Sequence, residues 1–118
     1  MNNVVVGLIK GRHEMPVEGY IFENPITDMF DYNGIQKHIY DWISVNVGIS
    51  KVTGIGINAY GSSDDYVDRG DKHLIVYVTG LTCVTAELIR CCAYNGVGLT
   101  LMHFDASTGE YKSQQIFQ

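Results

Sequence analysis

The chain has 118 residues, of which 46% are apolar and 18% are charged, so it is expected to form one compact domain spanning residues 1–118 rather than a disordered segment. Its formal net charge of −5 argues against broad binding to the phosphate backbone of DNA or RNA. The apolar runs are too short to cross a membrane, so we expect a soluble, cytoplasmic protein with no membrane partner.

The first predicted element is a buried strand over Val4–Ile9, which is apolar and β-branched on both faces. A long connection, residues 10–33, follows it. Within this connection Gly19–Phe22 can form a short edge strand, bounded by Pro16 and Pro25. A connection of this length is typical of a lid or an oligomer contact.

The first helix is predicted to begin at Asn33-Gly34 and to stop at Gly48, because glycine is favoured just after a helix. Its buried face repeats at helical spacing and consists of Ile35, Ile39, Trp42 and Ile43. A second strand is predicted over Val52–Tyr60, where apolar residues and small residues alternate. The acidic loop Gly61–Asp71 comes next, and we interpret its aspartates as a solvated surface rather than a cation site.

The clearest strand is Leu74–Val78, whose five consecutive apolar residues place it in the centre of the sheet. The turn Thr79-Gly80-Leu81-Thr82 leads from it into a helix over about Cys83–Tyr94, which should end at Asn95-Gly96. The buried stripe of this helix is predicted to consist of Ala86, Leu88, Ile89 and Cys92.

The last two strands are predicted over Val97–Phe104 and Glu110–Phe117, joined by a short hairpin loop at 105–109. Residues 74–104 therefore read as strand, helix, strand, which is typical of a right-handed parallel crossover. The predicted fold is a small α/β, Rossmann-like sheet that is mostly parallel. It has an antiparallel C-terminal edge hairpin and two main helices, in two or three layers.

Polar residues follow three of these strands, and ligands of open parallel sheets bind beyond the carboxyl ends of strands. The glycine turn should let the backbone approach a ligand, and the helix start should offer free N–H groups to an anion. The segment is neither a P-loop nor a dinucleotide fingerprint, because the required glycine and lysine spacings are absent. The candidate ligand-binding residues are Lys10, Arg12, His13, Thr79, Gly80, Leu81, Thr82 and His103.

Each candidate also has a purely structural interpretation. Thr82 can simply cap the helix, and Gly80 can be a turn residue with a positive φ, in which case Gly80→Val should be costly. Arg12 can hold a phosphate and His13 can act as acid or base, or both can make local salt bridges in a solvated loop. His103 shares a face with Leu99 and Leu101 and is expected to be half-buried.

The three cysteines, Cys83, Cys91 and Cys92, fall in one predicted helix and form no disulfide framework, which suits a reducing compartment. Cys83 lies at the helix start, where a thiol is acidified, but the sequence offers it no evident catalytic partner. Neither a CxxC pair nor a nearby histidine accompanies them, so we predict no metal site and no cofactor. No catalytic residue is assigned.

The segment Leu74–Thr82, followed by a helix, resembles the strand, threonine- and glycine-rich turn and helix of CARF-type domains. That resemblance covers about a third of the chain. It implies a Rossmann-like fold that binds cyclic oligonucleotide signals, as ring nucleases of this type do before cleaving them. The size and acidic charge of the chain are also similar to those of phage proteins that sequester nucleotide signals of bacterial defence.

Three functions follow from these observations. The first is binding or sequestering a small anionic, nucleotide-like ligand at the carboxyl ends of the sheet. The second is a metal-independent phosphodiesterase, similar to a ring nuclease, that uses His13 or His103 with Arg12. The third is an acidic protein-interaction module that inhibits a partner. A homo-oligomer, most simply a dimer, is expected because the edge strand Glu110–Phe117 ends in two apolar residues.

Overall fold

The computed structural model describes residues 2–11, 14–48 and 72–117 of the chain. The predicted strand at 52–60 and the acidic loop after it lie outside the described residues. The described elements are β1 (Asn2–Ile9), β2 (Tyr20–Phe22), α1 (Tyr32–Asn46), β3 (Lys72–Tyr77), α2 (Thr82–Asn95), β4 (Gly98–Asp105) and β5 (Glu110–Phe117).

These strands form one five-stranded sheet in the order β2-β1-β3-β4-β5. The first four strands are parallel to one another, and β5 pairs antiparallel with β4 at the edge. The predicted fold class is therefore confirmed: a mostly parallel α/β sheet with an antiparallel C-terminal hairpin and two helices.

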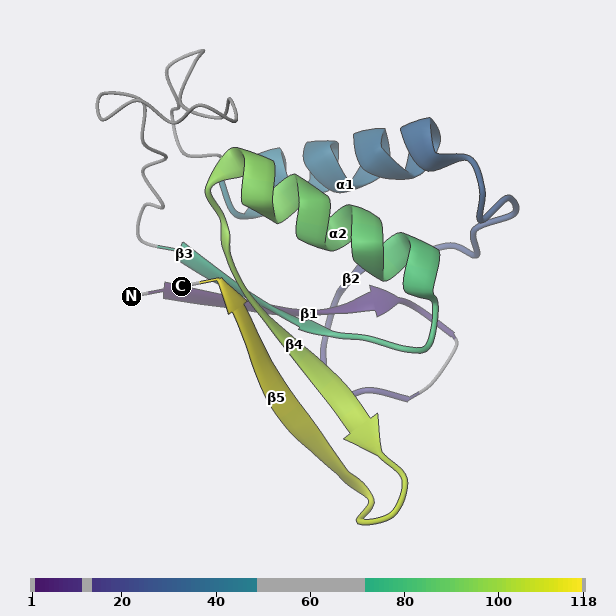
Figure 1. The fold of residues 1–118 in the computed structure, drawn as a ribbon, viewed down its shortest axis with the longest axis vertical. Coiled ribbons are helices and arrows are strands. Elements are labelled where there is room, and N and C mark those ends of the chain that lie inside the picture. The colour runs from purple at the N-terminus through teal and green to yellow at the C-terminus, as the bar shows by residue number, and fades with distance from the viewer. Residues whose placement is uncertain (1, 12–13, 49–71, 118) are drawn as a thin grey trace.

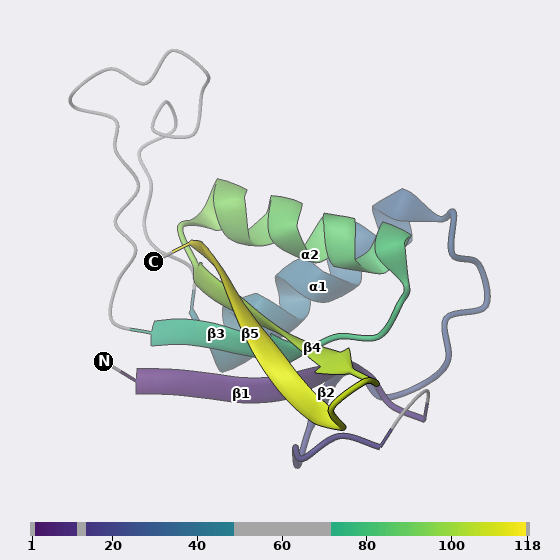
Figure 2. The same cartoon turned by 60° about the horizontal axis from the view of Figure 1, so that its bottom comes forward.

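Both helices cover the same face of the sheet, so the described part of the chain has two layers (Figures 1 and 2). The handedness of parallel crossovers explains this arrangement. The connection from β2 through α1 to β3 and the one from β3 through α2 to β4 both step in the same direction across the sheet. Right-handed crossovers that step the same way place their helices on the same side.

The loop between β1 and β2 steps in the opposite direction, and it lies against the other face of the sheet. A Cβ atom built on Gly7 of β1 would meet the ring of Tyr20 and would come within 2.9 Å of Met15 Sδ. Gly7 alternates with Val6 and Leu8, which face the helices, so the contact is on the face that the helices leave open.

The core lies between the sheet and the two helices. Alternate residues of the three central strands point toward the helices and are buried, which removes them from water at a gain of about 1.5–3 kcal/mol for each large side chain. The fully buried large side chains include Leu8, Ile39, Ile43, Leu74, Val76, Val84, Leu88, Cys92 and Leu99.

Helix α1 begins at Tyr32, one residue before the predicted start, and stops before Gly48 as predicted. Asp31 caps it, because the backbone N–H of Gly34 donates to Asp31 Oδ1 at 3.1 Å. Gly48 follows the helix with φ +91°, and its N–H donates to the carbonyl oxygen of Ile43 at 2.8 Å. His38 also ties α1 to the sheet edge, since its Nε2 lies 2.7 Å from the carbonyl oxygen of Ile21.

Helix α2 ends at Gly96, which has φ +67° as the predicted stop requires. The predicted buried stripe is partly wrong, because Ala86 is exposed and Ile89 is only half-buried. The buried residues of α2 are Val84, Leu88, Cys91 and Cys92. Helix α1 packs beside α2 on its Cys91 side, which turns the buried face away from Ala86.

The open face of the sheet carries a cluster of aromatic rings near the carboxyl end of β3. The ring of Tyr111 makes edge contacts with Tyr77, at 4.7 Å between centroids, and with Phe104, at 5.3 Å. Its hydroxyl donates to the carbonyl oxygen of Glu14 at 3.2 Å. Burial, followed by the nearby Tyr77 and Tyr20, raises the pKa of Tyr111 above its usual value.

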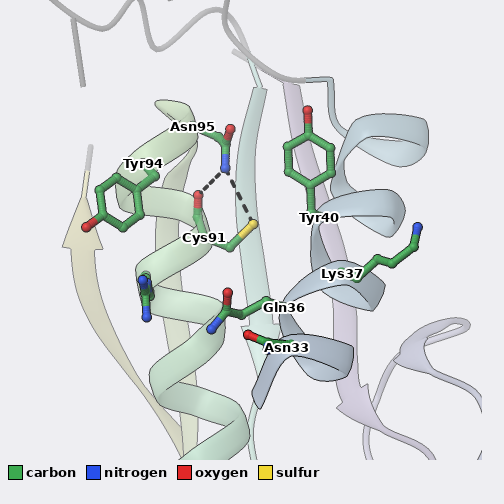
Figure 3. Close-up of a pocket in the computed structure, with 8 residues that line it drawn as sticks. Asn33, Gln36, Lys37, Tyr40, Cys91, Tyr94 and Asn95 are labelled. Atoms are coloured by element: carbon green, nitrogen blue, oxygen red, sulfur yellow. Dashed lines mark hydrogen bonds between the residues drawn. The ribbon is translucent and has the colours of Figure 1, made fainter. Parts of the chain in front are cut away.

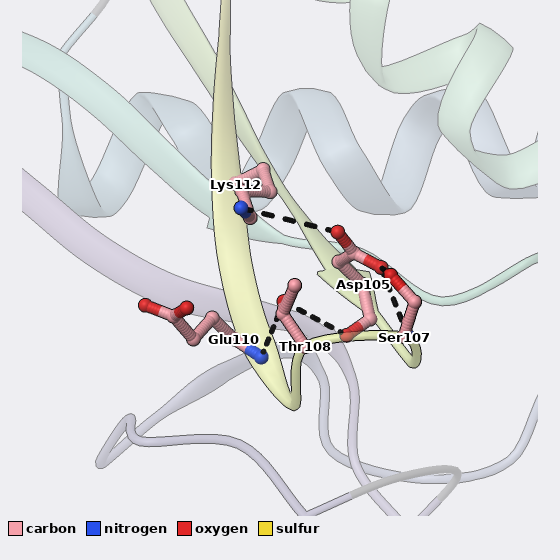
Figure 4. Close-up of polar contacts among 5 residues, drawn as sticks. All are labelled: Asp105, Ser107, Thr108, Glu110 and Lys112. Carbon is pink, nitrogen blue, oxygen red and sulfur yellow. Dashed lines mark hydrogen bonds and ion pairs between the residues drawn. The ribbon is translucent and has the colours of Figure 1, made fainter.

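The hairpin between β4 and β5 is closed by a small polar network (Figure 4). Ser107 donates to Asp105 Oδ1 through its backbone N–H at 3.0 Å and through its hydroxyl at 2.6 Å. These hydrogen bonds lower the pKa of Asp105. Gly109 turns the chain with φ +75°, as the hairpin prediction requires.

Candidate functional site

A cavity of about 290 Å³ lies where the carboxyl ends of β3 and β4 meet the start of α2. It brings together four of the eight predicted ligand-binding residues, which were chosen from two separate segments of the sequence. Its lining residues are Val78, Thr79, Gly80, Thr82, Thr85, Ala86, Ile89 and His103.

The other predicted residues do not line this cavity. Leu81 is the N-cap residue of α2, and its side chain packs against the core. Lys10 is exposed just after β1, where its backbone N–H donates to the carbonyl oxygen of Phe22 at 3.0 Å. Arg12 and His13 lie outside the described residues. The parallel pairing of β1 with β3 is confirmed, so the end of β1 emerges at the same sheet edge as Thr79.

Helix α2 begins without a side-chain cap among the described residues. The prediction that Thr82 caps it is wrong, because Leu81 is the N-cap and Thr82 is already the first helical residue. The hydroxyl of Thr85 donates backward to the carbonyl oxygen of Leu81 at 3.0 Å. The first N–H groups of a helix have no partner within the helix, so the start of α2 presents free donors and a partial positive charge.

The expectation that Gly80 has a positive φ is also wrong. Its φ is not positive, and no described atom lies within 4 Å of a Cβ built at this position. The chain turns here because the N–H of Leu81 donates to the carbonyl oxygen of Thr79 at 2.7 Å, a three-residue turn that needs no left-handed residue. Gly80→Val therefore has no steric reason to be costly.

Two polar side chains of the cavity differ in their partners. The hydroxyl oxygen of Thr79 is buried and has no hydrogen-bond partner in the part of the chain that the structure describes. His103 shares a hydrogen bond with Gln114 Oε1 at 2.8 Å. It is exposed rather than half-buried as predicted, because β4 extends past its last pair with β3, at Tyr77 and Met102.

Acidic groups lie on the α1 side of the α2 start, away from the cavity. Partial desolvation, followed by Cys83, Glu87 and Asp28, raises the pKa of the Tyr32 hydroxyl at the beginning of α1. Glu87 Oε1 is buried without a partner among the described residues. By contrast, the described lining of the cavity contains no carboxylate, so an anion fits the cavity side of α2 better than the α1 side.

The described residues offer few groups for binding a metal ion or for a nucleophilic reaction. The described ranges contain no group of three or more histidine, cysteine or acidic side chains placed to hold a metal ion. Burial raises the pKa of Cys91 to about 11, so this thiol stays neutral at physiological pH. None of the described helices is both long enough and apolar enough to cross a membrane.

Sequence reasoning missed the second wall of the cavity, which consists of Thr85, Ala86 and Ile89. The signal was present, because Thr82, Thr85 and Ile89 recur at i, i+3 and i+7 and so share one face of α2. A search for apolar periodicity alone overlooks a face that mixes hydroxyl and apolar groups.

Comparison with known proteins gives no match: no family model, no curated protein and no solved structure matches this chain. The resemblance of residues 74–82 to CARF-type domains therefore stays a prediction from that segment alone.

Proposed function

We propose that this protein binds or sequesters a small anionic, nucleotide-like ligand in the cavity at the carboxyl ends of β3 and β4. The observation that carries the proposal is the uncapped start of α2, which borders a cavity where the Thr79 hydroxyl is buried without a partner among the described residues. Polar groups that are buried in a folded protein are normally paired, so an unpaired hydroxyl beside free helix donors suits a ligand.

The two walls of the cavity contact different parts of the proposed ligand. The free N–H groups at the start of α2 and the Thr82 hydroxyl bind the anionic group, and each charge-assisted hydrogen bond contributes about 1.5–3 kcal/mol. The apolar wall formed by Val78 and Ile89 packs against the uncharged part of the ligand. A volume of about 290 Å³ lies at the lower end for small-molecule sites, so it suits one nucleotide unit.

A phosphodiesterase is the second function that the residues allow. His103 is the titratable group in the described cavity lining, and it already shares a hydrogen bond with Gln114. General acid–base cleavage normally uses two groups, and the second candidates, Arg12 and His13, are outside the described residues. Turnover of a cyclic nucleotide by the protein would favour the enzyme over a binding protein.

Replacing Thr82 with proline should weaken anion binding by about tenfold, because it removes one free N–H from the helix start. Proline is tolerated at the first helical position, so α2 should remain folded. Thr82→Ala is the matched control, since it removes the hydroxyl and keeps the N–H. The measurement is a ¹⁵N NMR titration with adenosine monophosphate and, separately, with inorganic phosphate, which should move the backbone amides of residues 82–85.

If neither probe moves these amides at millimolar concentration, or if Thr82→Pro binds as well as the unaltered protein, the cavity is not an anion site. Equal affinity for phosphate and the nucleotide would rule out recognition of the nucleoside part. Circular dichroism of Thr82→Pro checks that the helix is retained.

We further propose that the protein forms a dimer, although the apolar end of β5, from which the sequence predicts a dimer, does not support it. Ile116 and Phe117 pack against the core, so they do not need a second chain to cover them. The outer edge of β5 pairs with no strand in the described residues, and Phe104 and Val5 remain exposed on the open face. Unpaired strand edges and exposed apolar side chains favour association. Light scattering at high micromolar concentration should return a dimer, and a monomer there contradicts this expectation.

A further inference from the structure

A second cavity, of about 360 Å³, lies in the groove between α1 and α2 (Figure 3). It shares no lining residue with the cavity at the sheet edge. The groove is bordered by Asn33, Gln36 and Tyr40 from α1 and by Arg90, Tyr94 and Asn95 from α2. Arg90 lies two turns beyond Thr82 along the helix, or about 12 Å at the usual rise per residue, so the two sites can be tested separately.

Two carboxamides of the groove have unused hydrogen-bonding capacity within the described part of the chain. The side chains of Asn33 and Gln36 make no hydrogen bond to any other described residue, and both reach from α1 toward α2 (Figure 3). Asn95 differs, because its Nδ2 donates to the carbonyl oxygen of Cys91 at 2.8 Å. A free carboxamide presents a donor beside an acceptor, the pairing by which asparagine and glutamine recognise the edge of a nucleobase.

Aromatic rings and one cation complete the rim. Tyr40 and Tyr94 are 47% and 49% exposed, and Tyr40 offers a ring from α1 against which a planar ligand can pack. The guanidinium of Arg90 lies 5.6 Å from the ring centroid of Tyr94 and has no carboxylate within ion-pair distance among the described residues. Lys37 behaves differently, since it is paired with Asp41 at 2.8 Å and points away from α2 (Figure 3).

The inner wall of the groove includes Cys91, which is buried between the helices. Burial raises the pKa of this thiol to about 11, so it is neutral and a poor nucleophile at physiological pH. Asn95 Nδ2 lies 3.6 Å from Cys91 Sγ and keeps the thiol in place. The groove therefore combines a neutral wall and exposed rings with two carboxamides and an arginine. Among the described residues these carboxamides have no hydrogen-bond partner and the arginine has no carboxylate partner, a combination for binding rather than for reaction.

We propose that this groove is a second ligand site, which takes a planar heteroaromatic anion of the size of a nucleoside monophosphate. The base edge bonds to Asn33 and Gln36, the ring packs against Tyr40, and the phosphate pairs with Arg90. Guanidinium groups bind phosphate with two parallel hydrogen bonds, and stacking on a tyrosine holds the group in one orientation. This inference does not rest on the proposed function of the sheet-edge cavity.

The test is a ¹⁵N NMR titration of the whole chain with each of the four common nucleoside monophosphates. We expect shifts at the side-chain amides of Asn33 and Gln36 and at the backbone of residues 90–95. Arg90→Ala should weaken binding by about tenfold, the loss of one charge-assisted interaction. Gln36→Leu should weaken it by roughly fivefold or more and reduce discrimination among the bases.

Lys112→Ala is the charge-matched control, because it removes one positive charge from the distant β4–β5 hairpin, where Lys112 lies 3.9 Å from Asp105. It should leave the affinity measured at the groove amides unchanged. If Arg90→Ala lowers the melting temperature, Arg90→Gln replaces it in the binding test, because glutamine keeps a long polar side chain without the charge.

Three results would overturn the proposal. The first is that no nucleotide shifts the groove residues at millimolar concentration. The second is that inorganic phosphate alone produces the same shifts with the same affinity, which shows an anion site without base recognition. The third is that Lys112→Ala weakens binding as much as Arg90→Ala, which shows a general effect of charge. If Thr82→Pro loses the shifts of residues 82–85 but keeps the groove shifts, the two sites bind independently, as proposed.

Discussion

Gly7→Ala should destabilise the fold by about 1–3 kcal/mol, even though the substitution adds a single methyl group. In a domain of this size that loss corresponds to roughly 4 °C in melting temperature for each kcal/mol. Gly7 lies within β1, and its hydrogen atoms face the ring of Tyr20 and the sulfur of Met15. A Cβ atom there would overlap the ring and would come within 2.9 Å of Met15 Sδ.

Whether Gly7→Ala stabilises or destabilises the fold depends on the overlap between the added methyl group and the ring of Tyr20. Replacing glycine with alanine in a strand normally stabilises a protein by about 0.4–1 kcal/mol, because the unfolded chain loses freedom. The overlap with Tyr20 opposes that gain, since the ring is rigid and belongs to the residue that pairs with Gly7 across the two strands. The loop after β1 must therefore shift from the open face of the sheet.

Gly80→Ala is the matched control. Gly80 has no positive φ, and no described atom lies within 4 Å of the position that an added methyl group would take, so the melting temperature should stay the same or rise slightly. The double substitution of Gly7→Ala with Tyr20→Ala should cost less than the sum of the two single changes, because the ring is gone. Strict additivity, or a Gly7→Ala protein as stable as the original, contradicts the packing described for the open face.

Ile39→Ala should cost about 2–5 kcal/mol of the free energy of unfolding, which is the largest effect expected from any exchange considered for this chain. Ile39 is 0% exposed and lies between Ile35 and Ile43 on the buried face of α1. Removing its side chain beyond Cβ leaves a cavity between α1 and the sheet that the backbone cannot fill. Urea denaturation should show a lower midpoint with an unchanged slope.

Val45→Ala on the same helix is the control, because Val45 is 82% exposed and its replacement should change stability by less than about 0.5 kcal/mol. The loss of free energy of unfolding in Ile39→Val should lie between those of Ile39→Ala and Val45→Ala, at about 0.5–1.5 kcal/mol. Equal costs for Ile39→Ala and Val45→Ala would mean that α1 does not pack on the sheet as described. Since α1 supplies one wall of the inter-helix groove, Ile39→Ala should also weaken any ligand bound there.

Local signals in the sequence were enough for most of the described elements. The five apolar residues of Leu74–Val78 indicate a central strand, and Gly48 and Gly96 end their helices in the left-handed conformation that glycine favours. The position of the sheet-edge cavity was also predictable. Parallel strands place their carboxyl ends at one edge, so Thr79 and His103 meet although they are far apart in the chain.

The tertiary structure decided whatever depends on which elements become neighbours. The sequence of α2 is apolar on more than one side, and the packing of α1 beside it buries Cys91 rather than Ala86. The need for glycine at position 7 arises because Tyr20 and Met15, from later in the chain, lie over it. Likewise, the inter-helix groove exists because two crossovers of the same hand place both helices on one face, a relation between distant segments that no local pattern encodes.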